Sequence, residues 1–128
     1  MRILLDTHTF LWWIEASDRL SSKAMEVISD RHNTCYLSLV SVWEVAIKIG
    51  LGKLSLSEPL EYFIGQELKK NKFRQLGIRL WHVSGVSTLP LHHRDPFDRL
   101  LISQALMEGM PILSADEVID AYGVTRWW

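Results

Sequence analysis

Met1-Arg2-Ile3-Leu4-Leu5-Asp6-Thr7-His8 is the stretch that decides the fold of this chain. Its three consecutive apolar residues, 3–5, lead directly into an aspartate. A short apolar run without alternation is typical of a strand that is buried on both faces, as in a parallel sheet. Open sheets of this kind bind their ligands at the carboxyl ends of the strands. We therefore expect the first strand to present Asp6 at a ligand-binding edge.

Segments typical of strands and of helices alternate along the rest of the chain. Strands are predicted at 3–5, 34–39, 79–83 and 111–114, and the apolar tail 124–128 can add an edge strand. Helices are predicted at 9–15, 21–30, 41–50, 58–71, 96–108 and 117–121. This alternation predicts an α/β fold with three layers, in which helices cover both faces of a central, mostly parallel sheet of four to five strands.

The length and composition indicate an ordinary globular protein. The 128 residues are expected to form a single domain, residues 1–128. No apolar run approaches the roughly 18 residues of a membrane span, and no signal peptide is evident, so a cytoplasmic location is expected. Cys35 is the only cysteine, which excludes an internal disulfide and a cluster of thiolate metal ligands.

The net charge of −1, from 14 basic and 15 acidic residues, argues against a domain that is basic throughout. One local cluster of basic residues consists of Lys69, Lys70, Lys72, Arg74 and Arg79. Such a cluster is either the solvated end of a helix or part of a path for a nucleic acid.

Two aspartates, Asp6 and Asp116, stand where predicted strands end. Each can cap the helix that follows it, which is a common role of aspartate. Capping alone accounts for either residue taken separately.

Glu44 lies in an otherwise apolar segment, and two structural roles are open to it. With Ser41 it forms the pattern of a capping box, and with Lys48 it forms an i,i+4 ion pair worth about 0.2–0.5 kcal/mol. Its setting favours a further role. A charge in the first turn of a mostly buried helix, just after a strand, points toward the carboxyl edge of the sheet.

Asp95 and Asp98 belong to the start of one predicted helix. Asp95 precedes a proline and is well explained as the N-cap. Asp98 is different, because Leu101, Ile102 and Ala105 follow it at helical spacing and place it on their apolar stripe. A carboxylate on a core-facing stripe is costly unless it is paired or bound to a metal.

Together, these carboxylates predict a metal site. If the strands are parallel, Asp6, Glu44, Asp98 and Asp116 meet at one sheet edge, where their charges repel. A divalent cation neutralises such a cluster, and oxygen ligands favour Mg²⁺ or Mn²⁺ over Zn²⁺. Magnesium held by carboxylates normally acts on phosphates, so hydrolysis of a phosphodiester bond is the expected reaction.

Four motifs of the sequence are also similar to those of a known family. They are Leu5-Asp6-Thr7, Ser41-Val42-Trp43-Glu44, His93-Arg94-Asp95-Pro96-Phe97-Asp98-Arg99-Leu100-Leu101-Ile102 and Leu113-Ser114-Ala115-Asp116. These motifs resemble those of the PIN-domain ribonucleases and, more narrowly, of the VapC-type toxins of bacterial type II toxin–antitoxin systems. The resemblance covers essentially the whole chain, and the stretch 95–102 is its most specific part.

The resemblance implies a PIN-like domain that acts as a Mg²⁺- or Mn²⁺-dependent endoribonuclease. Asp6 and Asp98 would be metal ligands, and Glu44 would bind the metal or orient the attacking water. Asp116 would complete the cluster of catalytic carboxylates, either directly or through water. Many relatives carry an asparagine near this position and an aspartate further on, where this chain has Ile119, so the chain departs from the family's pattern at the fourth acid.

Further residues take supporting roles by the same resemblance. Thr7 and Ser41 would support the site by hydrogen bonds. Asp95 is extra to the general pattern of the family and is interpreted as a cap that also reaches the site. An RNA substrate implies basic contacts, for which the candidates are Lys69, Lys70, Lys72, Arg74, Arg94 and Arg99.

The resemblance also implies protein partners and no membrane. A small cognate antitoxin would wrap the protein and block the site, and the chain would form a homodimer or a heteromer with the antitoxin. Trp12 and Trp13 on the first helix suggest a protein-binding groove. Trp43 also falls on a helix that is expected to be buried, whereas Trp127 and Trp128 could be exposed to a partner.

Two other functions fit parts of the sequence. A phosphatase of the haloacid dehalogenase type also has an aspartate after its first strand, but it needs a second aspartate two residues later, where this chain has His8. A non-catalytic binding or regulatory module would keep the fold and use its acids as caps. His92 and His93 are expected in a solvated loop, with contact to an RNA phosphate or a catalytic role as alternatives.

Overall fold

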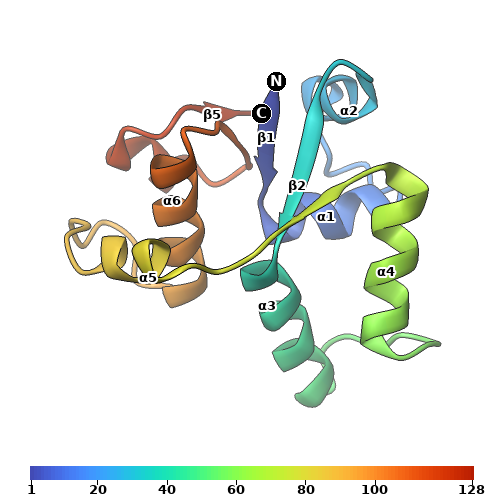
Figure 1. Cartoon of the computed structure of the whole chain (residues 1–128). Helices are drawn as coiled ribbons and strands as arrows, with labels where there is room; N and C mark the ends of the chain where they lie inside the picture. Colours follow the sequence, from blue (N-terminus) through green and yellow to red (C-terminus); the bar gives the residue numbers. More distant parts are fainter.

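Five parallel strands form the centre of the structure, a computed structural model that describes residues 1–128 (Figure 1). The strands are β1 (Arg2–Leu5), β2 (Thr34–Ser38), β3 (Arg74–Leu76), β4 (Ile112–Leu113) and β5 (Arg126–Trp127). Their order is β3-β2-β1-β4-β5, so β1 is central and pairs in parallel with both β2 and β4. The predicted α/β fold with a parallel sheet is thus confirmed.

Helices connect the strands and cover both faces of the sheet. They are α1 (Thr7–Ile14), α2 (Ser22–Ser29), α3 (Leu39–Gly50), α4 (Leu60–Asn71), α5 (Leu80–Val86), α6 (Pro96–Glu108) and the short 3₁₀ helix η1 (Glu117–Tyr122). None of these helices combines the length and the apolar character that a membrane span requires.

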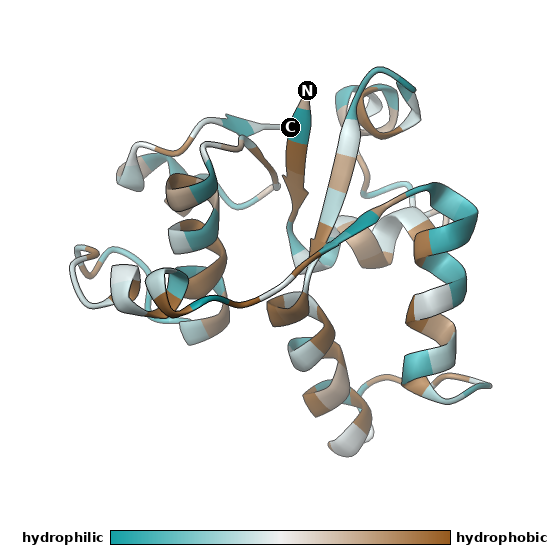
Figure 2. Ribbon diagram, viewed as in Figure 1, coloured by the Kyte–Doolittle hydropathy of each residue, from teal (hydrophilic) through white to brown (hydrophobic).

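The alternation of side chains along β1 divides the core into two parts. Ile3, Leu4 and Leu5 are all fully buried, as expected for a strand covered on both faces. Ile3 and Leu5 belong to a cluster on the side of α1, α2 and α4, whereas Leu4 belongs to a cluster with α6 and η1. Figure 2 shows the hydrophobic colouring along β1, which lies between these two layers.

Helix α6 has the ends that its sequence predicts. The side chain of Asp95 accepts hydrogen bonds from the backbone N–H groups of Phe97 and Asp98, and Pro96 takes the first helical position. Gly109 ends the helix at φ 64°, in the left-handed region where glycine costs least. These signals fix where Asp98 stands on the helix.

The strand predicted at 79–83 is wrong. The third strand is Arg74–Leu76, and most of the predicted segment lies in α5. The alternation from Arg79 to Val83 suggested a strand, but the buried residues are His82 and Gly85, three positions apart on one face of a helix. The His82 imidazole also accepts the backbone N–H of Arg79, which stabilises the first turn of α5.

Helix α3 begins earlier than predicted. Ser38 is its N-cap and accepts the backbone N–H of Val40, so Ser41 and Glu44 do not form the expected capping box. Glu44 consequently lies in the second turn, not the first. Its ion pair with Lys48 is present, with 3.7 Å between the Oε2 and Nζ atoms.

Two smaller differences concern a helix end and a tryptophan. Helix α4 begins at Leu60, and Pro59 is its N-cap without a side-chain hydrogen bond. Trp43, expected in the core, is 53% exposed and packs edge-on against Phe97, with 4.8 Å between the ring centroids. The tail does add an edge strand, because β5 pairs in parallel with β4.

Replacing Gly85 by alanine is expected to destabilise the packing of α5 on α6. A Cβ atom at this position would collide with the Ser103 hydroxyl and lie 2.8 Å from Cε of Met107. Ser103 cannot easily move, because its hydroxyl donates a 2.6 Å hydrogen bond to the His82 carbonyl. Overpacking of this kind costs about 1–3 kcal/mol in the free energy of unfolding, which urea denaturation measures.

Gly65 provides the matched control, because it lies inside α4 with nothing within 4 Å of the added Cβ. Gly65→Ala should stabilise the protein by about 0.5–1 kcal/mol, since alanine is the better helix former. Equal effects of the two substitutions would contradict the close approach of α5 and α6.

Candidate metal centre

Asp6 is the most enclosed of the predicted acidic residues. It ends β1, caps α1 and is only 6% exposed. Its Oδ1 accepts the backbone N–H of Thr7 at 2.7 Å, and its Oδ2 accepts the hydroxyl of Ser114 at 2.6 Å. Burial raises the pKa of Asp6, and the hydrogen bond from Ser114 partly offsets this. The carboxylate is therefore held rigidly at the carboxyl edge of the sheet.

Ser114 links the acids at the ends of two neighbouring strands. Its hydroxyl donates to Asp6 and accepts the backbone N–H of Asp116 at 3.0 Å. The side chain is fully buried. Ser114 was not among the predicted site residues, although a serine two residues before an acid at a strand end is a signal that could have indicated it.

Thr7 and Ser41 support the site together. The Thr7 hydroxyl donates to the Ser41 hydroxyl at 2.8 Å, and both residues are buried. This bond ties the first turn of α1 to α3, the helix that carries Glu44. It holds two helices that begin at the same sheet edge.

Asp98 lies in the first turn of α6, next to its buried apolar stripe. Burial, followed by the negative charges of Asp6 and Asp95, raises the pKa of Asp98 to about 7. These influences show that the carboxylates from β1 and α6 are electrostatic neighbours.

Glu44 belongs to the same charged group. Its negative charge contributes to the raised pKa values of both Asp6 and Asp98. Its Oε1 atom is buried and has no hydrogen-bond partner, although Oε2 faces Lys48. A buried carboxylate oxygen without a partner is costly and indicates that a cation or a proton donor belongs beside it.

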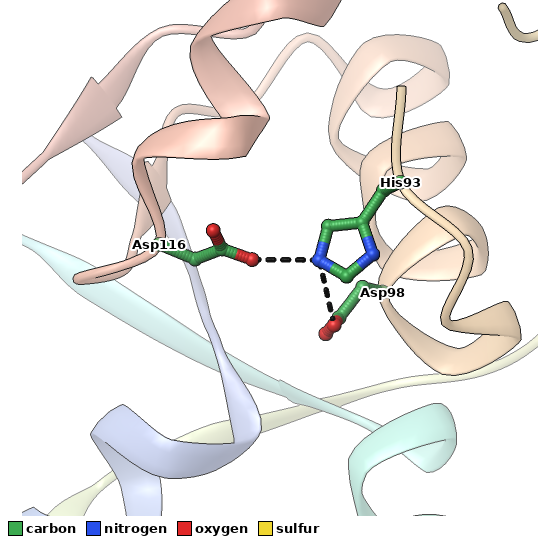
Figure 3. A group of neighbouring side chains, drawn as sticks. All are labelled: His93, Asp98 and Asp116. Carbon is green, nitrogen blue, oxygen red and sulfur yellow. Dashed lines mark hydrogen bonds and ion pairs between the residues drawn. The ribbon is translucent and has the colours of Figure 1, made fainter. Parts of the chain in front are cut away.

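His93 stands between two of the acids (Figure 3). Its Nε2 atom is 2.7 Å from Oδ2 of Asp116 and 3.1 Å from Oδ2 of Asp98. The expectation of a solvated loop histidine is therefore wrong, since only 17% of this side chain is exposed. His92 differs, because it is exposed and its ring packs edge-on against Tyr122.

The hydrogen bonds of His93 assign its proton. The Nδ1 atom accepts the backbone N–H of Asp95 at 3.2 Å and so carries no hydrogen. The Nε2 atom therefore carries the proton, donates a hydrogen bond to Asp116 and lies within ion-pair distance of Asp98. In this tautomer His93 bridges the two acids as a donor and offers no free lone pair at Nε2.

The loop before α6 is held by Arg99 and Tyr122. The Arg99 guanidinium donates to four backbone carbonyls, those of Val86, Leu89, Pro90 and His93. The Tyr122 hydroxyl accepts the backbone N–H groups of His92 and His93. Arg99, predicted as an RNA contact, is thus engaged in fixing the loop that carries His93.

One cavity of about 450 Å³ contains most of the site. The residues that line it are Asp6, His8, Trp12, Arg19, His93, Asp98, Ala115 and Asp116. Three of the four predicted catalytic acids thus face a common space at the carboxyl edge of the sheet. Glu44 is close enough to influence their charges but does not line this cavity.

The predicted basic contacts do not converge on this cavity. Lys69 and Lys70 lie at the end of α4, followed by Lys72 and by Arg74 at the start of β3. Parallel strands all begin at the edge opposite the acids, so this exposed cluster lies away from the site. Arg94 is exposed beside His93 and remains near it.

The residues present fit a divalent cation. Carboxylate oxygens of Asp98 and Asp116 lie within 4.8 Å of each other, and Asp6 lines the same cavity. The raised pKa of Asp98 and the unpartnered oxygen of Glu44 both report uncompensated negative charge. Because the available donors are carboxylate oxygens, a hard cation such as Mg²⁺ or Mn²⁺ matches them best.

Comparison with known proteins identifies the fold. The PIN domain family matches the chain over residues 3–124. No curated protein matches it. Similar solved structures include VapBC2 from Rickettsia felis bound to a DNA fragment from its promoter, with a TM-score of 0.73, 14% identity and coverage of 99% of this chain and 98% of that chain.

Two further structures have a TM-score of 0.66. FitAcB from Neisseria gonorrhoeae is 15% identical and is matched over 98% of this chain and 96% of its own. VapBC-1 from nontypeable Haemophilus influenzae is 14% identical, with coverage of 99% and 97%. At these identities the likeness concerns the fold.

Replacing Asp98 by asparagine is expected to stabilise the metal-free protein at neutral and alkaline pH. The pKa of Asp98 is about 7 in the folded protein, against an ordinary value of 3.8. The folded state therefore binds more protons than the unfolded state between about pH 4 and pH 7, so the free energy of unfolding falls as the pH rises through this window. The variant lacks this loss and gains on the order of 1–4 kcal/mol above pH 7.

Urea denaturation in EDTA from about pH 4 to pH 8 measures this difference. Asp30→Asn is the matched control, because Asp30 is exposed and a hydrogen bond from the His32 backbone lowers its pKa. Mg²⁺ at 100 times its dissociation constant should stabilise the wild type by about 2.7 kcal/mol and the Asp98 variant much less. Parallel pH profiles for the wild type and Asp98→Asn would refute the proposed repulsion.

Proposed function

Because the chain belongs to the PIN domain family, we propose that it is a Mg²⁺- or Mn²⁺-dependent endoribonuclease that hydrolyses RNA phosphodiester bonds. PIN domains are generally nucleases. One observation carries the proposal: Asp6, Asp98 and Asp116, from three separate elements, line a single cavity at the carboxyl edge of the sheet. Carboxylates that repel one another in this way match a site for a divalent metal and a phosphate.

A bound divalent cation would supply an acidified water and neutralise charge on the phosphoryl oxygens. Asp6 and Asp98 are the proposed ligands, and Asp6 is held in place before any ligand binds, by Ser114 and Thr7. Such preorganisation lowers the cost of binding, because the carboxylate need not be ordered. Asp116 joins them directly or through water.

Glu44 and His93 would act on either side of these ligands. The free Oε1 of Glu44 is available to bind the cation or to accept a hydrogen bond from the attacking water. His93 would keep Asp98 and Asp116 oriented through its Nε2–H group. Asp95 contributes the N-cap of α6 and the backbone N–H that fixes the His93 tautomer.

The toxin component of a type II toxin–antitoxin pair is the biological role that we propose. The similar structures of VapBC and FitAcB complexes support this role, as do the motifs of the VapC-type toxins. A small antitoxin would cover the site and inhibit it. Both the antitoxin and the RNA would be met in the cytoplasm, where we propose that the protein acts as a single domain.

Two apolar hollows support the proposed binding of an antitoxin. One, of about 530 Å³, lies between α3 and α4 and is lined by Leu39, Val42, Leu60, Glu61, Ile64, Gly65, Leu68 and Gln75. The other, of about 260 Å³, is lined by Trp13, Ala16, Ser17, Leu20 and Met25. Exposed apolar residues on α5, among them Leu80 and Trp81, support dimerisation of the chain.

A non-catalytic module is the second candidate, because the caps that it requires are present. Asp6, Asp95 and Asp116 each accept a backbone N–H at the start of a helix. Capping does not account for Asp98, however, since it caps nothing and lies among other acids. A cleavage assay distinguishes the two candidates.

Asp6→Asn and Asp98→Asn are each expected to abolish RNA cleavage in Mg²⁺ or Mn²⁺ while the protein stays folded. Loss of an outer-shell partner typically costs about 10–100-fold in metal affinity or activity, and loss of a ligand should cost more. Asn keeps the size of each side chain and removes its charge. Gel analysis of labelled RNA, with and without EDTA, measures the effect.

Asp30→Asn is again the matched control, because this exposed acid lies before β2, at the opposite edge of the sheet. Circular dichroism melts of every variant show that the fold is kept. Cleavage that continues at the wild-type rate in both site variants, or in EDTA, would overturn the proposal in favour of the non-catalytic module.

Co-expression with a small protein encoded next to this chain should yield a stable complex that no longer cleaves RNA. A polar substitution at Leu39, an exposed leucine that lines the hollow between α3 and α4, should weaken the complex without slowing cleavage by the free protein. Co-purification and cleavage assays measure both effects. Failure of any encoded neighbour to bind would remove the toxin role but not the nuclease activity.

A further inference from the structure

One wall of the acidic cavity carries no acid. It is formed by His8 and Trp12 of α1 and by Arg19, which follows that helix. We propose that this wall is a subsite for an unpaired nucleobase of the RNA, which stacks on Trp12 while Arg19 binds the adjacent phosphate. The assignment rests on the proposed nuclease function and names how its substrate is held.

Trp12 is a partly buried ring that other rings hold in place. The centroid of the His8 ring lies 5.7 Å from that of Trp12, at an interplanar angle of 37°. The ring of Trp128 lies at the same distance of 5.7 Å, at 58°. An aromatic surface that is already ordered loses little entropy on binding, and every base can stack on it. Trp12 is thus suited to hold a base without reading its identity.

Arg19 supplies the positive charge beside this aromatic surface. The residue is exposed, and its guanidinium makes no hydrogen bond or ion pair, although the cavity that it lines contains Asp6, Asp98 and Asp116. An unpaired guanidinium is available for bidentate binding of a phosphate. The carboxylates repel a phosphate, so they cannot bind it themselves. Arg19 would instead attract the phosphate backbone of the RNA to the cavity, beside the proposed metal site.

The same pairing of aromatic and basic residues occurs again beyond Trp12. The Lys23 ammonium of α2 lies 5.8 Å from the ring centroid of Trp127 on β5. Trp127 is followed by Trp128, whose ring contacts Trp12. Aromatic side chains combined with positive charge are typical of surfaces that bind single-stranded nucleic acid. The proposed RNA-binding surface therefore extends from the cavity along the side of α1 and α2.

Trp13, on the same helix, lies in surroundings that differ from those of Trp12 and suit a protein partner. Its indole N–H donates to the Asn71 side chain, and its ring lines a hollow with Leu20 and Met25 that contains no charged residue. Trp12, one residue earlier, lines a cavity with a free arginine and three acids. The unpaired arginine beside Trp12 favours an anionic ligand on this wall of the cavity, and the apolar surroundings of Trp13 favour a protein.

The test is a double-mutant cycle on binding of a fluorescently labelled single-stranded RNA, measured by anisotropy in Ca²⁺. Three proteins are compared: the wild type, Trp12→Ala and Trp12→Phe. Each is measured with intact RNA and with a series of RNAs in which one base has been removed, at a different position in each. Trp12→Ala should weaken binding of intact RNA by about 5–150-fold, the range expected for the loss of one stacked base. Trp12→Phe should recover most of this loss.

At one abasic position the effect of Trp12→Ala should disappear, because the base that stacks on the ring is already missing. Arg19→Gln should reduce the slope of log affinity against log salt by about 0.7, the value for one phosphate contact with a single strand. Tyr62→Ala is the matched control, since this aromatic residue is 55% exposed on α4 and does not line the cavity.

If the losses of affinity from Trp12→Ala and from the missing base were additive at every abasic position, the stacking on Trp12 would be overturned. Normal RNA binding by Trp12→Ala together with loss of the complex with a partner protein would also overturn it and would make this wall a protein-docking surface. Binding decides the subsite even if the wild type cleaves no RNA, and that failure would count against the nuclease function alone. Thermal melts of Trp12→Ala and Trp12→Phe separate loss of stacking from loss of fold.

Discussion

The parallel pairing of β1 with β2 on one side and β4 on the other is the constraint on which the rest of the structure depends. Parallel strands all end at the same edge, so the acids that follow β1 and β4 must meet, although 110 positions separate Asp6 from Asp116. The fold thereby concentrates like charge, and the raised pKa values of Asp6 and Asp98 report its cost. Ser114 reduces this cost by donating a hydrogen bond to the most buried of these acids.

Features that depend on local pattern were predictable from the sequence. The apolar run of β1, the capped start of α6 and its glycine end each need only neighbouring residues to be recognised. Asp98 could be singled out because helical periodicity alone places it on an apolar stripe. The segment around β3 was not predictable in this way, because a three-residue edge strand is defined by its pairing with β2, and the alternation after it suits a strand as well as a helix.

Residues whose roles depend on contacts distant in sequence were missed or misplaced. His93 contacts Asp116, which lies 23 positions away, and its loop is held by Tyr122 and Arg99. No periodicity in the sequence reveals these contacts. Glu44 was assigned to the wrong turn because Ser38 and Ser41 both make plausible caps, and only the hydrogen bond of Ser38 to Val40 decides between them. The basic cluster near Lys69 was conspicuous in the sequence, but the direction of α4 places it at the far edge of the sheet.

The place of β4 in the sheet also determines when the site can exist during synthesis. The central strand leaves the ribosome long before its partner Ile112–Leu113 and the acid Asp116. Contacts between such distant residues form late, because the entropy cost of closing a long loop must be met before the contacts can stabilise the fold. A nascent chain therefore carries Asp6 without Ser114 or Asp116, and its cavity has no complete set of acids. For a protein that we propose to cut RNA, this order of assembly delays an active nuclease until the segment that carries Asp116 has been synthesised and folded.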